Sequence, residues 1–485
     1  MASLTNHEQN LHPINNWGLD KRTVHSISTI EVHTESPLTK TTVLDALYRT
    51  ISKCPQLSSV VDNGKFKPAG TTLADLDLDV EFIEIIQSLT KFKKEKELKA
   101  DMNRPLNEYL GYRFKFFITQ PVKGRDKTVV QIHTRISILQ SLMDESGLKL
   151  LHHCFGKSLE EAIISEKQIS LATPLKNLED GINVKSISSQ TLYSTVLLML
   201  QYTWNLVIGF WLLNQFGRNF IIRHFKYSGS KDPSNVDQET VKNPNGIRLI
   251  ELPADRFNTV MVEGKKINGS ITSIIAISGL IAYQDLATHQ KAKFSDVYNV
   301  VLAADSRAPD VYKSKEFLRN QTYQLYFYGY KLNQGEEFWK HVLLFETKVQ
   351  TALKSLLSFI QCYNFIPTFF IKRVMMLQKL NQKRDYQLQI NDLGTLNIKD
   401  EELSNRVYLT DCIVTSNSFY TGNRSLLQIT SLIVKDKLQL MIGYPTYMIT
   451  EDEIDYFIDS LLNVLDKAVQ DPSVTCLKAQ ATKYN

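Results

Sequence analysis

The chain has 485 residues, a formal net charge of +5 and a hydrophobic content of 43%. This length exceeds what one ordinary hydrophobic core organises, so we expect two domains, and the composition excludes disordered, collagen-like and disulfide-rich classes. A basic cluster at residues 91–99 (KFKKEKELK) is interrupted by glutamate. This pattern is typical of a solvated helix face, and we therefore expect no nucleic-acid partner.

The five cysteines are far apart, and none forms a CxxC pair. This spacing does not support a zinc site or a disulfide framework, and it fits a reducing compartment. The first residues are polar and lack the apolar core of a signal peptide. We therefore expect a cytosol-facing protein with no metal site.

In the first half, residues 42–54 (TVLDALYRTISKC) predict an amphipathic helix, because apolar side chains recur on one face. Thr42 and Asp45 have the spacing of a capping box at its start. Residues 112–118 and 128–139 are rich in β-branched and aromatic residues and predict strands. The first half therefore mixes helices and strands.

An apolar segment follows at residues 196–213 (VLLMLQYTWNLVIGFWLL). Its length is borderline for a membrane-spanning helix, and Gln201 and Asn205 interrupt it. Aromatic residues and the following Arg218 and Arg223 suit a helix that lies on a membrane surface. The alternative is a buried core helix or a cover over a substrate site, and the sequence leaves both open.

Residues 227–246 (YSGSKDPSNVDQETVKNPNG) are polar and lack apolar periodicity, which predicts a linker. The linker divides the chain into an N-terminal lobe, residues 1–226, and a C-terminal lobe, residues 247–485. The C-terminal pattern predicts strands at 247–252 and 297–303, helices at 271–286 and 338–360, a hairpin at 426–434 and 438–442, and a last helix capped by Thr450 and Glu453. Both lobes are therefore expected to be α+β.

The sequence contains no glycine-rich phosphate loop, HExxH helix or GxSxG elbow. Its informative window is residues 131–155 (QIHTRISILQSLMDESGLKLLHHCF). There a predicted strand enters a turn that contains Gln140 and Asp144. An apolar helix follows, and we expect it to end at His152 and His153.

This window resembles the strand, HxxxDG and helix signature of the condensation-domain superfamily, which includes fungal alcohol acetyltransferases. Here the motif is QxxxDE, with Gln140 at the histidine position and Asp144 at the aspartate position. Further similar segments occur in the family's order: KCPQL at 53–57, IELPADRF at 250–257, VLAADSRAP at 301–309, EEFW at 336–339 and INDLGTL at 390–396. Within the superfamily the chain looks closest to these fungal enzymes and to the yeast N-acetyltransferase that inactivates sphingosine-like immunosuppressants.

The resemblance implies two chloramphenicol-acetyltransferase-like lobes with a substrate tunnel between them. It implies acetyl-CoA as co-substrate, a hydrophobic alcohol or long-chain amine as acceptor, and no other cofactor. In the family the motif histidine accepts a proton from the acceptor, as imidazole can near neutral pH. The resemblance also gives Asp144 a structural ion pair with Arg307, and it places Asn391 and Gly394 at the tunnel.

Glutamine cannot serve as that base, because an amide has no useful basicity. One alternative is that Gln140 marks an active site that has lost its catalytic function. Alternatively, His133 is the base if the strand register shifts, or His152 or His153 reaches the tunnel from the following helix. A partly neutral amine acceptor can also react through orientation alone.

Two functions therefore remain open at the level of sequence. The first is an acetyl-CoA-dependent O- or N-acetyltransferase, expected as a monomer on the cytoplasmic side, with possible contact of residues 196–213 with the endoplasmic reticulum membrane or a lipid droplet surface. The second is a non-catalytic protein that binds a lipid or a partner in the same tunnel. Gln140 and Glu145, which replace the histidine and glycine of the family motif, favour the second function.

Overall fold

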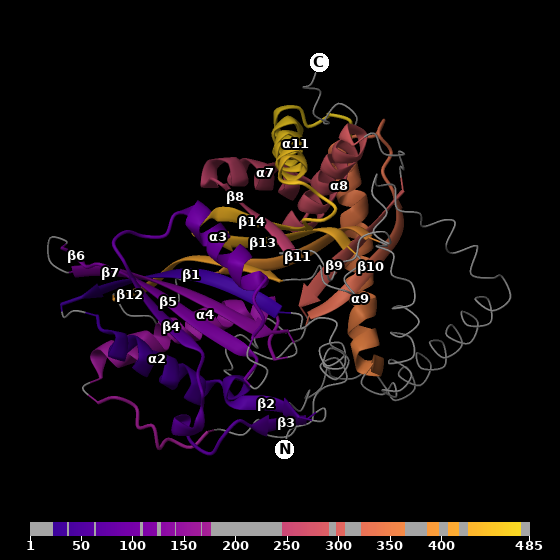
Figure 1. Cartoon of the computed structure of the whole chain (residues 1–485). Helices are drawn as coiled ribbons and strands as arrows, with labels where there is room; N and C mark the ends of the chain where they lie inside the picture. Colours follow the sequence, from indigo (N-terminus) through magenta and orange to yellow (C-terminus); the bar gives the residue numbers. More distant parts are fainter. Residues whose placement is uncertain are drawn as a thin grey trace.

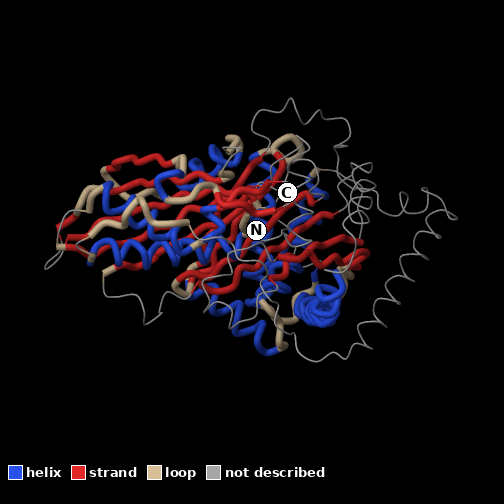
Figure 2. Tube along the Cα trace, turned by 90° about the horizontal axis from the view of Figure 1, so that it is seen from below, coloured by secondary structure: helices blue, strands red, loops and turns tan. Residues whose placement is uncertain are grey.

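The computed structural model describes residues 23–35, 38–62, 65–106, 110–123, 128–140, 142–165, 167–175, 245–290, 297–305, 322–363, 386–396, 406–416 and 425–476. Two mixed β-sheets, each covered by helices, lie next to each other (Figure 1). Seen from below, the strands form a central band with helices along it (Figure 2). The predicted segment 196–213 and residues 227–244 of the predicted linker lie outside the described residues.

The N-terminal sheet has the order β12-β1-β7-β5-β4, and β6 pairs with one end of β7. Its strands are β1 (Thr23–Thr34), β4 (Val80–Ile85), β5 (Tyr112–Thr119), β6 (Val122–Lys123), β7 (Thr128–Leu139) and β12 (Val407–Ser416). Strand β12 comes from the second half of the chain and pairs with β1. The predicted C-terminal lobe, 247–485, thus contributes a strand to the N-terminal sheet, which satisfies backbone groups that β1 would otherwise expose as an edge.

The two faces of the N-terminal sheet differ in character. Helices α2 (Lys40–Lys53) and α4 (Glu145–Ile164) pack on an apolar face that includes Ile132 and Ile136. Because strand side chains alternate between faces, His133 and Arg135 point to the other face. Helix α3 (Lys91–Met102) covers that second face, where Arg135 Nη1 binds Glu97 at 2.7 Å. The sheet therefore has an apolar face and a polar, charged face.

The C-terminal sheet has the order β10-β9-β11-β13-β14-β8. Its strands are β8 (Asn245–Leu252), β9 (Val297–Asp305), β10 (Thr322–Lys331), β11 (Tyr386–Leu396), β13 (Ser425–Val434) and β14 (Lys437–Pro445). Helices α7 (Ala254–Lys266), α8 (Ile271–His289), α9 (Phe338–Tyr363) and α11 (Glu451–Gln470) share its hydrophobic core. Smaller elements of the first half are β2 (Ser59–Asp62), β3 (Lys65–Pro68) and the 3₁₀ turns η1 (Pro55–Ser58) and η2 (Leu73–Asp75).

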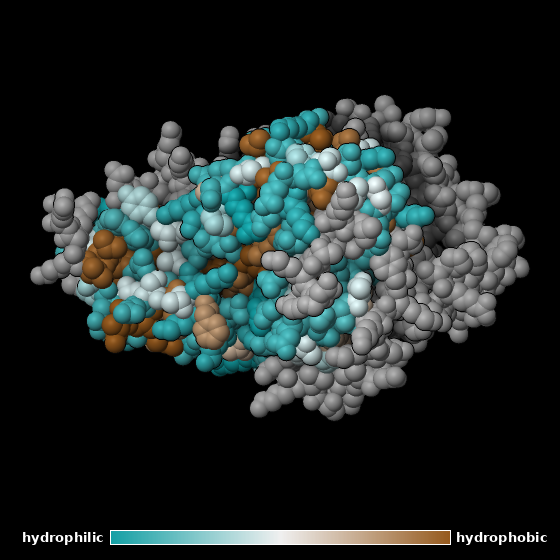
Figure 3. All heavy atoms as spheres, turned by 90° about the horizontal axis from the view of Figure 1, so that it is seen from above, coloured by the Kyte–Doolittle hydropathy of each residue, from teal (hydrophilic) through white to brown (hydrophobic). Residues whose placement is uncertain are grey.

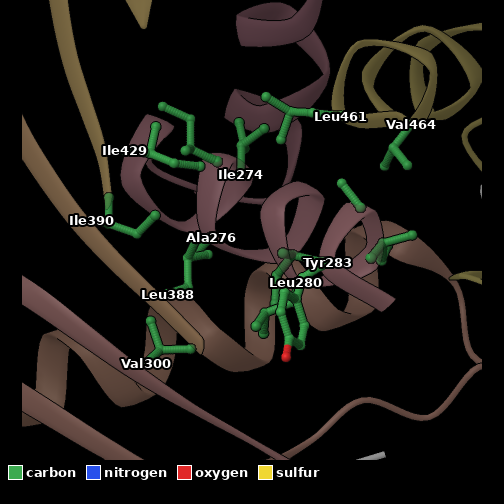
Figure 4. Close-up of a cluster of buried hydrophobic side chains, with 14 of the residues drawn as sticks. Ile274, Ala276, Leu280, Tyr283, Val300, Leu388, Ile390, Ile429, Leu461 and Val464 are labelled. Atoms are coloured by element: carbon green, nitrogen blue, oxygen red, sulfur yellow. The ribbon is translucent and has the colours of Figure 1, made fainter. Parts of the chain in front are cut away.

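Helix α8 lies at the centre of this core, against Leu388, Ile390 and Ile429 (Figure 4). A Cβ atom on Gly279 would lie 2.8 Å from the Leu388 side chain, so the small residue permits the close approach of helix and sheet. Among the described residues, α8 alone has the length and hydropathy of a membrane-spanning helix, and 89% of that window is buried inside the protein.

The structure confirms the predicted elements that fall within the described residues, with two differences. Helix α2 is capped by Thr39, whose Oγ1 accepts the Thr42 N–H at 3.1 Å, so the predicted capping box of Thr42 and Asp45 is wrong. Asp45 instead binds Arg49 at 2.7 Å. Helix α4 runs on to Ile164 instead of ending at the histidine pair, because its buried apolar face continues.

The two sheets meet along an apolar seam beside α3. Its buried members are Ile27, Leu98, Met102, Ile247, Leu249, Ile413 and Met441. Polar contacts border the seam: Lys94 Nζ donates to Asp411, and Lys99 Nζ lies 2.7 Å from Glu451 Oε1 of α11. Seen from above, the described part of the surface is mainly hydrophilic, with apolar patches across it (Figure 3). The seam therefore joins elements from both halves of the chain.

Candidate active site at the junction of the two sheets

The motif turn connects β7 to α4. The Leu139 carbonyl accepts the N–H groups of Leu142 and Met143 at 2.9 and 3.2 Å, which closes the turn. Asp144 then caps α4, because its Oδ1 accepts the Gly147 N–H at 2.7 Å. Asp144 is fully buried, whereas Gln140 is half-buried in the turn. The motif thus fixes the path of the chain from strand to helix.

Asp144 also reaches the C-terminal sheet. Its Oδ2 accepts a hydrogen bond of 2.9 Å from Thr322 Oγ1 at the start of β10. Thr322 is the register partner of Asp305, the last residue of β9. The motif turn is therefore held against the strand ends of the other half. Arg307 lies outside the described residues, so its ion pair with Asp144 stays a prediction.

A second contact joins α4 to β11. Lys149 Nζ donates to the Leu393 carbonyl, and both residues are buried. The next residue, Gly394, has a φ of +66° where the register of β11 against β13 shifts. A residue with a Cβ would be strained in this conformation, which accounts for the glycine. Gly394 therefore lies where β11 passes the motif helix.

Asn391 belongs to a buried polar surface of the C-terminal sheet. Its neighbours Leu388 and Ile390 face the hydrophobic core, so Asn391 points to the opposite face. Buried polar residues of this face include Gln389, Asn391, Gln428, Thr430 and Gln439. The Gln428 Nε2 donates to Ser416 Oγ of β12 at 2.9 Å, which shows that this face lies against the N-terminal sheet. The junction is thus lined by amide and hydroxyl groups.

His133, one predicted alternative base, is completely buried. Its Nε2 accepts the Leu89 N–H at 3.0 Å, and its Nδ1 lies 3.0 Å from Thr29 Oγ1. Burial, together with the positive charge of Lys94, lowers the pKa of His133 to about 3. Because a backbone N–H occupies its basic nitrogen, this geometry favours a structural role.

His152 is also completely buried, between Ser26 Oγ at 2.6 Å and Ser28 Oγ at 2.8 Å. Burial lowers the pKa of His152 to about 3. The adjacent His153 is half-buried on α4. These contacts link the middle of α4 to β1, at a distance along the helix from the motif turn.

A third completely buried histidine, His25 of β1, was not singled out in the sequence. Its Nε2 lies 2.6 Å from Thr23 Oγ1, and its Nδ1 lies 2.8 Å from Ser137 Oγ and 3.6 Å from Asp101 Oδ2. Ser137 Oγ donates to the same carboxylate oxygen of Asp101. The available signal was the alternation of polar residues on β1, which places Thr23 and His25 on one face.

Asp101 is the charged centre of this group. Arg113 Nη1 and Arg135 Nη2 each lie 3.1 Å from its Oδ1. Burial opposes ionisation, but the contact with His25 and the charges of Arg135 and Arg113 lower the pKa of Asp101 to about 2. Asp101 is therefore a buried carboxylate anion at neutral pH. Within the described residues, no cluster of histidine, cysteine and acidic side chains forms a metal site.

Comparison with known proteins gave matches to solved structures only, since no family model and no curated protein matches the sequence. Trichothecene 15-O-acetyltransferase from Fusarium sporotrichioides has a TM-score of 0.63 and 12% identity, over 99% of this chain and 95% of that chain. The first condensation domain of the calcium-dependent antibiotic synthetase, in complex with a substrate analogue, has a TM-score of 0.60 and 12% identity, over 98% of both chains.

This chain has the condensation-domain fold. The epimerization domain of the third module of tyrocidine synthetase B also matches, with a TM-score of 0.55 and 11% identity over 98% of both chains. The predicted α+β, two-lobed architecture is therefore confirmed. At these identities the likeness is one of fold, and the condensation-domain fold alone does not fix a reaction.

Proposed function

We propose that this protein is an acyltransferase that moves an acetyl group from acetyl-CoA to the hydroxyl or amine of a hydrophobic small molecule. The observation that carries the proposal is the motif turn, in which Asp144 caps α4 and binds Thr322 of the other half. The turn thus lies at the junction of the two sheets, in a fold shared along the whole chain with an O-acetyltransferase.

The proposed reaction is the transfer of one acetyl group from a thioester to the acceptor. The acceptor oxygen or nitrogen forms a bond to the thioester carbonyl carbon, the carbon–sulfur bond breaks, and the thiolate takes up a proton. Buried amides at the junction, such as Gln389 and Asn391, are of a kind that can stabilise the oxyanion. Orientation of the two substrates between the sheets supplies a further part of the rate.

The finer features of the proposal rest on the sequence. The apolar segment 196–213 favours a lipophilic acceptor that is met at the endoplasmic reticulum membrane or a lipid droplet surface on the cytoplasmic side. The resemblance to fungal alcohol acetyltransferases and to the yeast sphingosine-like N-acetyltransferase favours a long-chain alcohol or amine. We propose a monomer with acetyl-CoA as co-substrate and no further cofactor.

A second candidate function is supported by one residue. Gln140 occupies the position where the family motif has its histidine, and an amide cannot accept the proton. A lapsed member of the fold would keep the junction and use it to bind a lipid or a partner. This candidate predicts ligand binding without turnover.

The experiment that separates the two candidates measures thiol release from acetyl-CoA by the full chain, with and without long-chain alcohols and amines. Acceptor-dependent release supports the transferase. Tight binding of an acceptor, with thiol release no faster than in buffer, favours the binding protein. A denatured sample of the same chain controls for uncatalysed aminolysis of the thioester.

A further inference from the structure

We infer that Thr23 is an acyl-accepting nucleophile activated by His25, so that the chain transfers its acyl group through a covalent threonine ester. The inference rests on the proposed acyl transfer and adds to it the residues that do the work of the missing motif histidine. It is carried by the Thr23–His25–Ser137–Asp101 chain of hydrogen bonds on the polar face of the N-terminal sheet.

The direction of each hydrogen bond in this chain follows from the charge of Asp101. A carboxylate can only accept, so the single Ser137 hydroxyl proton is directed to Asp101. Ser137 Oγ must then accept from His25 Nδ1–H. The neutral imidazole carries no second proton, so His25 Nε2 is an acceptor and receives the Thr23 hydroxyl proton at an oxygen–nitrogen distance of 2.6 Å.

A group of charged side chains surrounds Asp101 beside His25. The ion-paired groups of this cluster are Asp79, Glu81, Glu97, Asp101, Arg113, Lys115 and Arg135. Of the four carboxylates, Asp101 is the buried one, and its Oδ2 lies 3.6 Å from His25 Nδ1. Positive charge that develops on the imidazole as it takes up the Thr23 proton therefore faces a buried anion.

Two other completely buried histidines, His133 of β7 and His152 of α4, lack this arrangement. The Nε2 of His133 accepts the Leu89 N–H and also lies 3.1 Å from Ser88 Oγ, whereas the Nε2 of His25 is bound by the Thr23 hydroxyl. His152 is bound by the hydroxyls of Ser26 and Ser28, and neither is a carboxylate. Of these three rings, only that of His25 connects a hydroxyl at the strand end to a buried anion. This pattern is the one that activates a hydroxyl nucleophile.

Thr23 lies at the end of β1 that borders the junction. It is the register partner of Leu139, the residue before Gln140. The next residue, Val24, is the partner of Ser416, which binds Gln428 of the polar face of the C-terminal sheet. Thr23 is therefore placed between the motif turn and that polar face. The neighbouring Gln140 cannot accept a proton, but its amide is a donor of the kind that an oxyanion requires.

The reaction then has two balanced steps. In the first, Thr23 Oγ1 forms a bond to the thioester carbon, the carbon–sulfur bond breaks, and the Thr23 proton passes through His25 Nε2 to the departing thiolate. In the second, the acceptor hydroxyl or amine attacks the threonine ester and gives its proton to His25. His25 returns that proton to Thr23 Oγ1 as the ester bond breaks.

The test uses the full chain with acetyl-CoA and no acceptor, quenched in acid and measured by intact-protein mass and peptide mapping. We expect one acetyl group on Thr23 in the wild type and in Thr23→Ser, and none in Thr23→Val. A matched control is Thr134→Val on β7, because Thr134 is equally buried and its hydroxyl has no hydrogen-bond partner among the described residues. This control should acetylate as the wild type does.

His25→Gln should slow formation of the adduct by roughly 10²-fold or more, since a positioned base typically contributes that much. His341→Gln in α9 is its control, because His341 is also buried but contacts Tyr330, the Asn333 carbonyl and Glu336, none of which belongs to the Thr23–His25 group. Circular dichroism identifies any variant that does not fold. In that case the acetyl adducts of the wild type and of Thr23→Ser still test the inference.

The outcomes separate this inference from the proposed function. An acceptor that is acetylated by the wild type, with no acetyl on Thr23 and with Thr23→Val as active as wild type, overturns the inference and leaves the transferase standing. An acetyl on Thr23 that no alcohol or amine removes supports the inference and overturns the proposed acceptor class. Acetyl found only on another residue, or on none, also overturns the inference.

Discussion

At the scale of the residue, the motif turn holds an amide where a base would be expected. Gln140 is half-buried in the turn that Asp144 anchors at the junction. Gln140→His would place an imidazole there, and its unperturbed pKa near 6.5 suits proton transfer at neutral pH. The variant thereby gains a base for direct attack by the acceptor.

We predict that Gln140→His raises acceptor-dependent acetyl transfer by about 10²–10⁴-fold, the range that a positioned base contributes. Gln131→His, also half-buried but at the other end of the same strand, should leave the rate unchanged. The measurement is the rate of acceptor-dependent thiol release from acetyl-CoA by each variant. No gain from Gln140→His, with loss of activity in His133→Ala or His153→Ala, would instead identify one of those histidines as the base.

Two completely buried histidines, His133 of β7 and His152 of α4, predict a fold that is less stable in acid. His133 and His152 have pKa values lowered to about 3, chiefly by burial, so both stay neutral in the folded state. The unfolded chain binds a proton at each near pH 6.5, so the free energy of unfolding falls as pH drops from about 6.5 towards 3. Each contributes up to about 1.4 kcal/mol per pH unit.

Urea unfolding at pH 7, 6 and 5 measures this dependence. His152→Gln should lower stability at pH 7, because it disturbs two buried serines, and should reduce the slope with pH. A free energy of unfolding that is the same at pH 7 and pH 5 in the wild type would show that these histidines are not held neutral.

At the scale of the element, one carboxylate couples helix α4 to strand β10. Asp144→Ala removes an N-cap worth about 0.5–2 kcal/mol and a buried hydrogen bond to a charged group worth about 1.5–3 kcal/mol. We expect a loss of about 3 kcal/mol, and of roughly 3–5 kcal/mol if Arg307 is the buried partner that the sequence predicts. The measurement is chemical unfolding of Asp144→Ala, of Thr322→Val and of the double variant that carries both.

The double-mutant cycle should give a coupling of about 0.5–3 kcal/mol between Asp144 and Thr322. The control pair is Asp144→Ala with Thr450→Ala at the cap of α11, which should be additive because these caps share no partner. Additivity of Asp144→Ala and Thr322→Val would show that the motif turn is not tethered to β10.

The elements could be predicted wherever local pattern decides the structure. The hairpin of β13 and β14 is one case, since Lys435 and Asp436 both adopt positive φ in its two-residue turn. The pairing of β12 with β1 could not be predicted, because it joins segments far apart in the chain and its periodicity is that of any half-buried strand.

The site was predictable only in part for the same reason. Asp144 and Gln140 could be found from the spacing of one motif, and Asn391 and Gly394 from another. His25 could not, because its partners Ser137 and Asp101 come from a different strand and from α3. A buried network of this kind is assembled by tertiary packing, and the alternation along β1 indicates only that Thr23 and His25 share a face.

At the scale of the whole molecule, the exchange of β12 predicts that the two lobes unfold together. Strand β12 pairs with β1, and its neighbours β13 and β14 belong to the other sheet. The apolar seam and the contact of Lys94 with Asp411 add to this coupling. We predict one calorimetric transition for the full chain, with equal calorimetric and van't Hoff enthalpies. Two separated transitions would contradict this coupling.

The measurement that tests the central claim most directly is backbone hydrogen exchange of the full chain with and without saturating acetyl-CoA. If the junction of the two sheets binds the acyl donor, exchange should slow at the motif turn, residues 139–147, and in β11 around Asn391. Helix α7, which packs on the opposite, apolar face of the C-terminal sheet, should exchange at the same rate in both samples and serves as the internal control. Slowed exchange confined to regions away from the junction, or no slowing at all, would contradict the assignment of this junction as the acyl-transfer site.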